Sequence, residues 1–267
     1  MLTFSIVTVC FNDADALVPT IRSIVGQRFP GYQYVIQDGG STDDTNAVIA
    51  GFGDWIDVYQ STRDSGIYQA MNRAVQQCAG RYTLFINAAD ILISPSVLAE
   101  AAELLQDGDD VVTGDSIAME AGAPHKFTPG ENYWAGMTFD HQAAFVRTDL
   151  LKQNTFDETL RISGDFDFFS RLRRLGTKFR SIPLTIVQKP YAAGASLDFM
   201  ARFRERYGIA MRHFGEQFPV QETLKGELIQ HIIKSLDASA MRAKMESMPV
   251  AALVALHDRL STLASVR

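Results

Sequence analysis

The chain has 267 residues, of which 46% are hydrophobic and 21% charged, a balance typical of a soluble protein with one large α/β domain and an appendage. Its formal net charge of −6 disfavours a nucleic-acid backbone as the main partner, because such a partner requires clustered Lys and Arg. No apolar run approaches the roughly 20 residues that cross a bilayer. Met1 leads directly into the first predicted strand without a secretory signal, so we expect a cytoplasmic protein.

The first predicted elements form a strand, helix, strand unit. Residues Phe4–Cys10 are a nearly continuous apolar run, which is typical of a strand buried on both faces of a parallel sheet. Apolar residues recur at helical spacing over 17–25, and a second apolar strand covers Tyr34–Gln37. Open α/β sheets bind ligands beyond the carboxyl ends of their strands, so we expect the ligand side at Asn12 and Asp38.

Strands and helices continue to alternate up to about residue 113. Strands are predicted at Asp57–Gln60, Tyr82–Ile86 and Asp110–Thr113, with helices carried by apolar residues at 67–78 and 97–105. This alternation predicts a Rossmann-like, mainly parallel, doubly wound sheet. After Gly114 the pattern is less regular, and the sequence predicts a turn at 121–124, a strand at Phe139–Val146, and a helix from Asp165 to Leu175 that Gly176 ends.

The last part of the chain is predicted to be helical and richer in Arg. Phe199, Phe203, Tyr207 and Met211 keep a spacing of four, which predicts an amphipathic helix. We therefore divide the chain into an α/β domain at 1–196 and a helical C-terminal extension at 197–267. Two interpretations of the helix stay open: packing on the core or in a homodimer, and peripheral contact with the inner face of a membrane that carries a lipid-linked substrate.

Four acidic residues stand where a predicted strand ends or a helix opens: Asp38, Asp64, Asp90 and Asp165. Each by itself is compatible with a helix cap or a surface charge. Together they fall on one rim of the predicted sheet, where loops converge on a ligand. This pattern favours a site that binds a polar ligand and holds a carboxylate base.

Several separate motifs follow one another in the order seen in a known family. They are Thr8–Asn12, Asp38-Gly39-Gly40-Ser41-Thr42-Asp43, Asp64–Asn72, Asn87-Ala88-Ala89-Asp90, His141-Gln142 and Gly164-Asp165-Phe166-Asp167. Over residues 3–196 the chain resembles the inverting family-2 glycosyltransferases with the GT-A fold, especially bacterial members of the exopolysaccharide or colanic-acid type. The order of the motifs makes this resemblance specific, since any single motif would be weak evidence.

The resemblance implies a role for each of these positions. It implies that Asp165 is the general base, that Asp90 holds a Mn²⁺ or Mg²⁺ ion, and that Asp167 is a capping or structural carboxylate. A carboxylate can take the proton of an attacking sugar hydroxyl, and a divalent cation can neutralise a departing diphosphate. The nucleotide-sugar donor or the substrate would be bound by Thr8, Asn12, Asp38, Asp64, Asn72, Asn87 and His141. The implied acceptor is a saccharide or a lipid-linked saccharide, and Gly194–Ser196 would be a lid hinge.

One position departs from the family pattern. The usual acidic triplet has a further carboxylate where this chain has Ala89, and Asn87 replaces the first acid, so only Asp90 remains. A catalytically impaired nucleotide-sugar-binding partner or scaffold is therefore an alternative. A sugar-1-phosphate nucleotidyltransferase is a third interpretation, which the residues after the first strand disfavour because they are acidic and contain no glycine.

Overall fold

The computed structural model describes residues 2–120, 123–127, 138–190, 198–215, 220–236 and 241–264. The predicted division at 196 and the predicted hinge at Gly194–Ser196 lie outside these ranges, as does the first half of the predicted turn at 121–124. Within the described residues, nine strands form one sheet. The strands are β1 (Phe4–Cys10), β2 (Tyr32–Asp38), β3 (Val58–Ser61), β4 (Tyr82–Phe85), β5 (Ile91–Leu92), β6 (Val111–Glu120), β7 (Ala123–Phe127), β8 (Ala144–Arg147) and β9 (Phe179–Pro190).

The predicted α/β class with a C-terminal helical part is confirmed. The strand order is β3-β2-β1-β4-β8-β6-β9-β5, and β7 pairs with β6. Strands β3, β2, β1 and β4 are parallel neighbours, as predicted, whereas β8 joins β4 and β6 in antiparallel pairs. Because the four N-terminal strands run the same way, the loops that follow them meet at one edge of the sheet.

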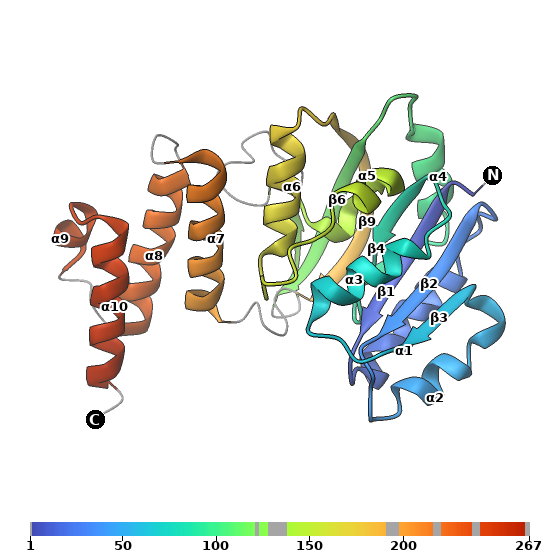
Figure 1. Ribbon diagram of the computed structural model, residues 1–267, viewed down its shortest axis with the longest axis horizontal. Coiled ribbons are helices and arrows are strands. Elements are labelled where there is room, and N and C mark those ends of the chain that lie inside the picture. Colours follow the sequence, from blue (N-terminus) through green and yellow to red (C-terminus); the bar gives the residue numbers. More distant parts are fainter. Residues whose placement is uncertain are drawn as a thin grey trace.

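Helices cover both faces of the sheet (Figure 1). Successive side chains of a strand point to opposite faces, so β1 places Phe4 and Ile6 in one core and Val7 and Val9 in the other. The first core is completed by α1 (Ala14–Val25), α2 (Thr45–Ala50) and α4 (Val97–Leu104). The second is completed by α3 (Ile67–Gln76), α5 (Thr148–Gln153) and α6 (Gly164–Arg174).

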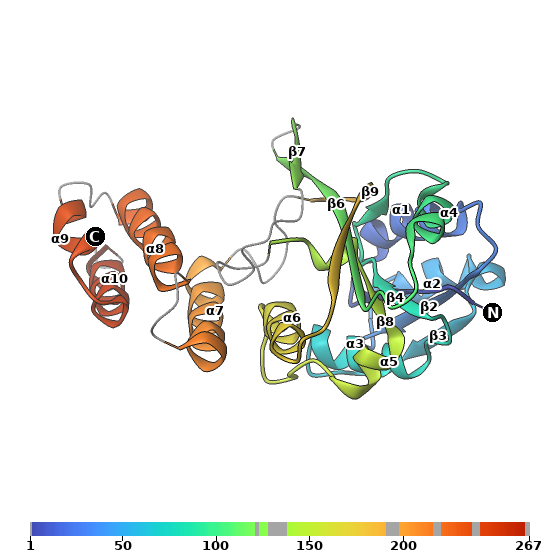
Figure 2. The same cartoon turned by 90° about the horizontal axis from the view of Figure 1, so that it is seen from above.

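The C-terminal helices form a third apolar cluster beside α6. They are α7 (Phe199–Phe214), α8 (Val220–Leu236), α9 (Arg242–Glu246) and α10 (Val250–Ala264). In Figures 1 and 2, α7 is the C-terminal helix nearest the sheet, and α6 lies between α7 and the sheet. Phe203 of α7 is buried in this cluster together with Phe166 of α6, so the apolar face of the predicted amphipathic helix packs within the molecule.

Two sequence-based predictions about the second half of the sheet are wrong in detail. Residues 139–146 do not form one strand: His141–Ala143 is a 3-10 turn, closed by a hydrogen bond from Ala143 N to Asp140 O, and β8 begins only at Ala144. Strand β6 runs to Glu120 instead of ending near Thr113, because it pairs along its length with β9 and β7. The 3-10 turn takes His141 out of the alternating strand pattern and allows it to face the loops of the site.

Candidate active site

The loops after β1 and β2 are joined by hydrogen bonds at the carboxyl edge of the sheet. Asn12 has a positive φ of 53°, a backbone conformation that Asn tolerates better than most residues. Its Oδ1 accepts a hydrogen bond of 2.8 Å from Thr42 N, and its own N–H donates to Ser41 Oγ at 2.8 Å. The predicted pair of Asn12 and Asp38 is therefore brought together, although Asn12 uses its side-chain oxygen to hold the loop.

Asp38 organises this loop from within. Its side chain is fully buried and accepts hydrogen bonds from Gly40 N at 3.1 Å, Ser41 N at 2.9 Å and Ser61 Oγ at 2.5 Å. A carboxylate that accepts several hydrogen bonds, two of them from backbone N–H groups, holds a turn strongly. In this structure Asp38 therefore shapes the loop that would meet a ligand, while its own oxygens are occupied by protein donors.

Asp64 lies against the same loop. A Cβ atom at Gly39 would stand 2.8 Å from Asp64 Oδ2 and 3.3 Å from the Phe11 ring, so a larger residue there would require the Asp64 side chain to move. Burial raises the pKa of Asp64 above its ordinary value, against the lowering effect of a hydrogen bond from Gly66 N. Phe11 is 57% exposed beside these residues and offers an aromatic surface at the rim. Sequence reasoning did not single out Phe11 as a residue of the site. The signal that could have found it is an aromatic residue directly after the apolar run of β1.

Two residues predicted to bind substrate are committed elsewhere. Thr8 is fully buried within the sheet, where its hydroxyl donates to Ile86 O at 2.8 Å. Asn72 donates to Phe156 O at 3.0 Å and accepts from Phe156 N at 2.9 Å, which ties α3 to the segment before α6. The structure does not bring Thr8 or Asn72 to the rim, because their polar atoms satisfy buried backbone groups.

The segment after β4 forms a tight turn around Asp90. Ala89 has a φ of 73°, Asp90 N donates to Asn87 O at 3.0 Å, and Asn87 N donates back to Asp90 Oδ2 at 3.1 Å. The Asp90 side chain is buried, and this burial raises its pKa to about 6, against the lowering effect of the nearby His141 and Lys189 charges. The turn thus places a carboxylate and an amide side by side at the end of the fourth parallel strand.

His141 connects this turn to α6. Its Nδ1 lies 2.9 Å from Asp165 Oδ2, and its Nε2 lies 3.4 Å from Asn87 Nδ2. With a proton on Nδ1, the ring donates to the Asp165 carboxylate. Burial alone would raise the pKa of Asp165, but the hydrogen bond and charge of His141 outweigh it and lower that pKa. Asp165 is therefore held as a carboxylate.

Asp167 lies two residues further along α6 and faces another way. It is buried, accepts a hydrogen bond from Arg171 Nε at 2.8 Å, and lies 2.8 Å from His213 Nε2 of α7. Its oxygens join α6 to α7. This position agrees with the structural role expected for it.

A divalent cation would find few protein ligands here. Among the described residues no group of three or more His, Cys, Asp and Glu side chains could hold a metal ion. The buried Asn87 Oδ1, however, has no hydrogen-bond partner, and an unsatisfied buried oxygen beside a carboxylate suits an ion that prefers oxygen ligands. Asp90 and Asn87 fit such an ion if phosphate and water supply the remaining ligands.

The fold and this site define a class: an α/β protein with a polar rim at the ends of parallel strands and, beside it, the carboxylate of Asp165 paired with His141. The sequence profile of glycosyl transferase family 2 matches residues 5–172, which is more than half of the chain. The protein belongs to glycosyl transferase family 2, and the predicted GT-A resemblance is confirmed.

Individual relatives agree with this assignment. The uncharacterized glycosyltransferase Rv1514c of Mycobacterium tuberculosis is 27% identical over 234 residues, covering 81% of this chain and 89% of the relative. The PGL/p-HBAD biosynthesis glycosyltransferase Rv2957 of the same species is 31% identical over 183 residues, covering 62% of this chain and 67% of the relative.

Solved structures show the same fold at low sequence identity. TarS of S. aureus superposes with a TM-score of 0.65 at 19% identity, covering 86% of this chain and 44% of TarS, so the chain spans less than half of that protein. The mannosyltransferase PcManGT of Pyrobaculum calidifontis, in complex with GDP-Man and Mn²⁺, has a TM-score of 0.65 at 16% identity. The match covers 97% of this chain and 80% of the PcManGT chain. Within the described residues, no helix combines the length and the apolar character needed to cross a membrane.

Proposed function

We propose that the protein is an inverting glycosyltransferase that moves a sugar from a UDP- or GDP-linked donor to a hydroxyl of a saccharide or lipid-linked acceptor in cell-surface polysaccharide synthesis. The observation that carries this proposal is the hydrogen-bonded chain from Asn87 through His141 to Asp165, next to Asp90 at the carboxyl end of β4. Membership in glycosyl transferase family 2 supports the reaction class. The complexes of TarS with UDP-GlcNAc and of PcManGT with GDP-Man support the two donor types.

In the proposed reaction Asp165 acts as the general base. The acceptor oxygen attacks the anomeric carbon, the bond from that carbon to the diphosphate oxygen breaks, and the nucleoside diphosphate leaves with the electron pair. The hydroxyl proton passes to Asp165, which is kept ionised by His141. Attack from the face opposite the leaving group inverts the anomeric centre.

The rim formed by Asn12, the Asp38 loop, Asp64 and Phe11 would receive the nucleoside. Asp90 and Asn87 would hold Mn²⁺ or Mg²⁺, which supplies positive charge against the departing diphosphate. Of the alternatives, the nucleotidyltransferase is not supported, because the chain belongs to a glycosyltransferase family. An impaired scaffold remains the second candidate, because Asn87 and Ala89 stand where the family resemblance implies acidic residues.

The C-terminal extension would serve the acceptor side. Its division from the catalytic domain near residue 196, a peripheral contact with the inner face of a membrane and a homodimer through these helices are all part of the proposal. A hydrolysis and thermal-shift screen of UDP- and GDP-sugars with Mn²⁺ or Mg²⁺ tests the function. A donor that binds only the folded protein raises its melting temperature by mass action. A folded protein that no donor stabilises and that hydrolyses none would contradict it.

Asp38→Ala should remove most of the stabilisation by UDP or GDP. The substitution deletes the acceptor for Gly40 N, Ser41 N and Ser61 Oγ, so the loop that meets the nucleotide loses its shape. We expect the nucleotide affinity to fall about 10-fold or more, which corresponds to about 1.4 kcal/mol. Calorimetry measures it. Asp54→Ala, an exposed change before β3, is the control, and equal affinity of the Asp38 variant and wild type would refute the pocket assignment.

His141→Ala should move the acid limb of the pH–rate profile to higher pH. The hydrogen bond and charge of His141 are the largest influences that lower the pKa of Asp165, so without them that pKa should rise. Asp165 then takes up a proton at a higher pH than in wild type, so the base is lost earlier as the pH falls. The transfer rate as a function of pH measures this. His257→Ala in α10 should leave the profile unchanged, and an unmoved acid limb in the His141 variant would contradict the pairing.

A further inference from the structure

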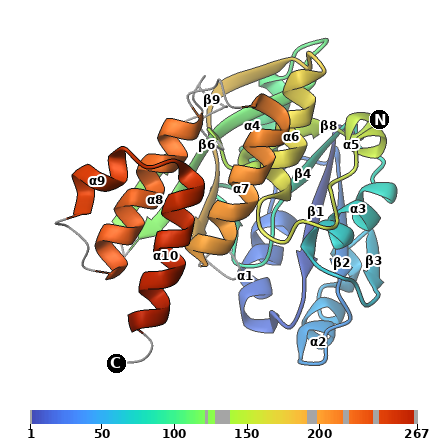
Figure 3. The same cartoon turned by 60° about the vertical axis from the view of Figure 1, so that its left-hand side comes forward.

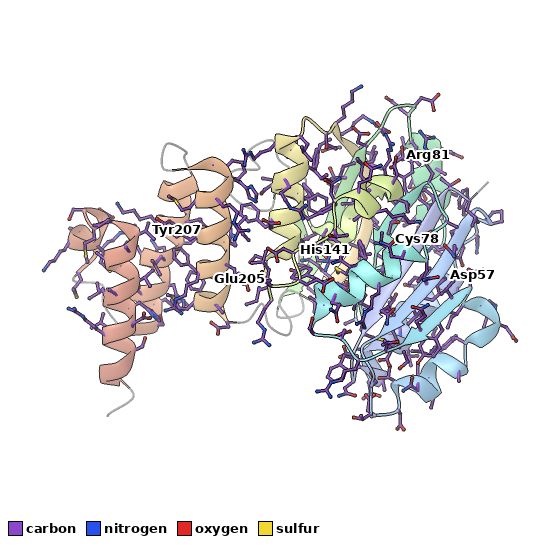
Figure 4. All side chains as sticks on the ribbon, in the orientation of Figure 1. Asp57, Cys78, Arg81, His141, Glu205 and Tyr207 are labelled. Carbon is purple, nitrogen blue, oxygen red and sulfur yellow. The ribbon has the colours of Figure 1, made fainter. Side chains whose placement is uncertain are left out.

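The segment that leads into α6 is held by a carboxylate from the C-terminal extension. Glu205 of α7 accepts hydrogen bonds from three consecutive backbone N–H groups: Arg161 N at 2.8 Å, Ile162 N at 2.9 Å and Ser163 N at 2.8 Å. Figure 4 labels Glu205 at the junction of α7 with the rest of the molecule, and Figure 3 shows α7 beside α6. Hydrogen bonds from backbone N–H groups to an ionised carboxylate are about twice as strong as neutral ones.

The same segment is held from the opposite side by the helix at the nucleotide rim. Tyr68 of α3 donates its hydroxyl proton to Ile162 O at 2.7 Å. A Cβ atom at Gly164 would stand 2.7 Å from the Tyr68 ring, so the backbone of the first residue of α6 lies directly on that ring. Residues 161–164 are thus held in place by contacts with Tyr68 and Glu205, and Asp165 is the next residue in the chain.

Side chains of α6 tighten the junction between the two parts of the chain. Phe166 is buried in the C-terminal cluster, whereas Phe168 is fully buried in the core beneath the sheet. His213 of α7 contacts Asp167 at 2.8 Å. The residues on both sides of Asp165 are therefore bound to α7, which limits how far the carboxylate can shift.

We propose that Glu205 is a positioning residue: it holds the 161–163 backbone so that Asp165 stays in line with the acceptor hydroxyl. This inference rests on the proposed function, and it gives the C-terminal extension a part in catalysis besides binding an acceptor. A general base must lie within hydrogen-bond reach of the proton that it takes, and a displacement of about 1 Å can cost about 10²-fold in rate. Nucleotide binding should not depend on Glu205, because its three backbone contacts lie on the base side of the site.

The test uses the full chain with Glu205→Gln. A glutamine keeps one acceptor oxygen but directs an NH₂ group toward a backbone N–H, so the grip is broken with little change in size. We expect kcat for transfer to fall about 10- to 10²-fold, with the donor Kd from calorimetry within about twofold of wild type. Glu227→Gln is the matched control, because Glu227 of α8 accepts a hydrogen bond from Arg206 of α7 and not from the described 161–163 backbone. It should retain the wild-type kcat.

A double-mutant cycle separates positioning from a general loss of stability. In the Asp165→Asn background, Glu205→Gln should cause little further loss, because the group that it positions is already disabled. An equal further loss in that background, or a parallel loss of donor affinity, would overturn the inference. If the Glu205 variant folds poorly, Tyr68→Phe takes its place. It removes the hydrogen bond to Ile162 O and should lower kcat without changing the donor affinity.

Hydrogen exchange tests the grip without turnover. The amides of residues 161–163 should exchange faster in the Glu205 variant than in wild type, and unchanged exchange would overturn the inference. The proposed function, by contrast, is tested by the transfer rate of the wild-type protein. The two hypotheses therefore fail on different measurements.

Discussion

Asp165→Asn should lower the rate of sugar transfer by roughly 10²–10⁴-fold, the contribution typical of a general base. An asparagine keeps the shape of the side chain and can still accept the hydrogen bond from His141, but it cannot take the proton of the acceptor hydroxyl. Donor affinity should barely change, since the carboxylate lies on the acceptor side of the reaction. Initial rates with a donor sugar and its acceptor, together with calorimetry of the nucleotide, measure both quantities.

Asp167→Asn is the matched control for this prediction. It makes the same chemical change two residues later, at a buried carboxylate that joins Arg171 and His213. We expect a lower melting temperature and a nearly normal rate per folded molecule, because breaking a buried, charged network destabilises the fold. If Asp167→Asn lost transfer while Asp165→Asn kept it, the assignment of the base would be wrong by two residues.

Asp90→Ala should abolish both transfer and the effect of metal on nucleotide binding. With a single carboxylate in the Asn87–Asp90 turn, a cation depends on the diphosphate for further oxygen ligands, so metal and nucleotide should strengthen each other's binding. Such coupling is typically about 5- to 150-fold. Several kcal/mol of leaving-group stabilisation would be lost, which exceeds about 10²-fold in rate. Titrations of UDP and GDP with and without Mn²⁺ measure the coupling.

Asp90→Asn separates the charge of Asp90 from its structural role. The amide oxygen can still accept from Asn87 N, so the turn should persist while metal affinity falls. Equal nucleotide affinities of wild type with and without Mn²⁺ would mean that no metal bridge forms. Transfer that persists in EDTA would assign the leaving-group role to side chains such as Arg63, in the loop after β3, or His141. A folded protein that binds donors and never transfers would favour the scaffold alternative.

Local sequence was sufficient for the elements that carry a strong apolar pattern. The first strand was predicted at its observed bounds, Phe4–Cys10, and α6 within one residue at each end. Continuous apolar runs and helical spacing report burial directly, because each depends only on neighbouring residues. Asp38, Asp64 and Asp90 were found for the same reason: Asp38 ends β2, and the other two lie in the loops that follow β3 and β4.

Weakly patterned elements could not be found in this way. Strand β9 contains Pro183 and ends at Pro190, residues that argue against an internal strand, and β5 is only two residues long. Both exist because a partner strand satisfies their backbone groups, which is information that a local window does not contain. The 3-10 turn that directs His141 toward Asp165 belongs to the same class of feature.

The amino-acid sequence by itself determined the α/β class, the carboxyl edge as the place of the site, and the chemical character of its residues. The tertiary structure decided which polar residues face that site. Thr8 and Asn72 form hydrogen bonds with backbone groups elsewhere, whereas His141 joins Asn87 to Asp165. It also brought Glu205 to a backbone segment 42 to 44 residues earlier in the chain. Composition and spacing describe what a residue can do, but a hydrogen bond between distant segments depends on which loops the folded sheet brings together.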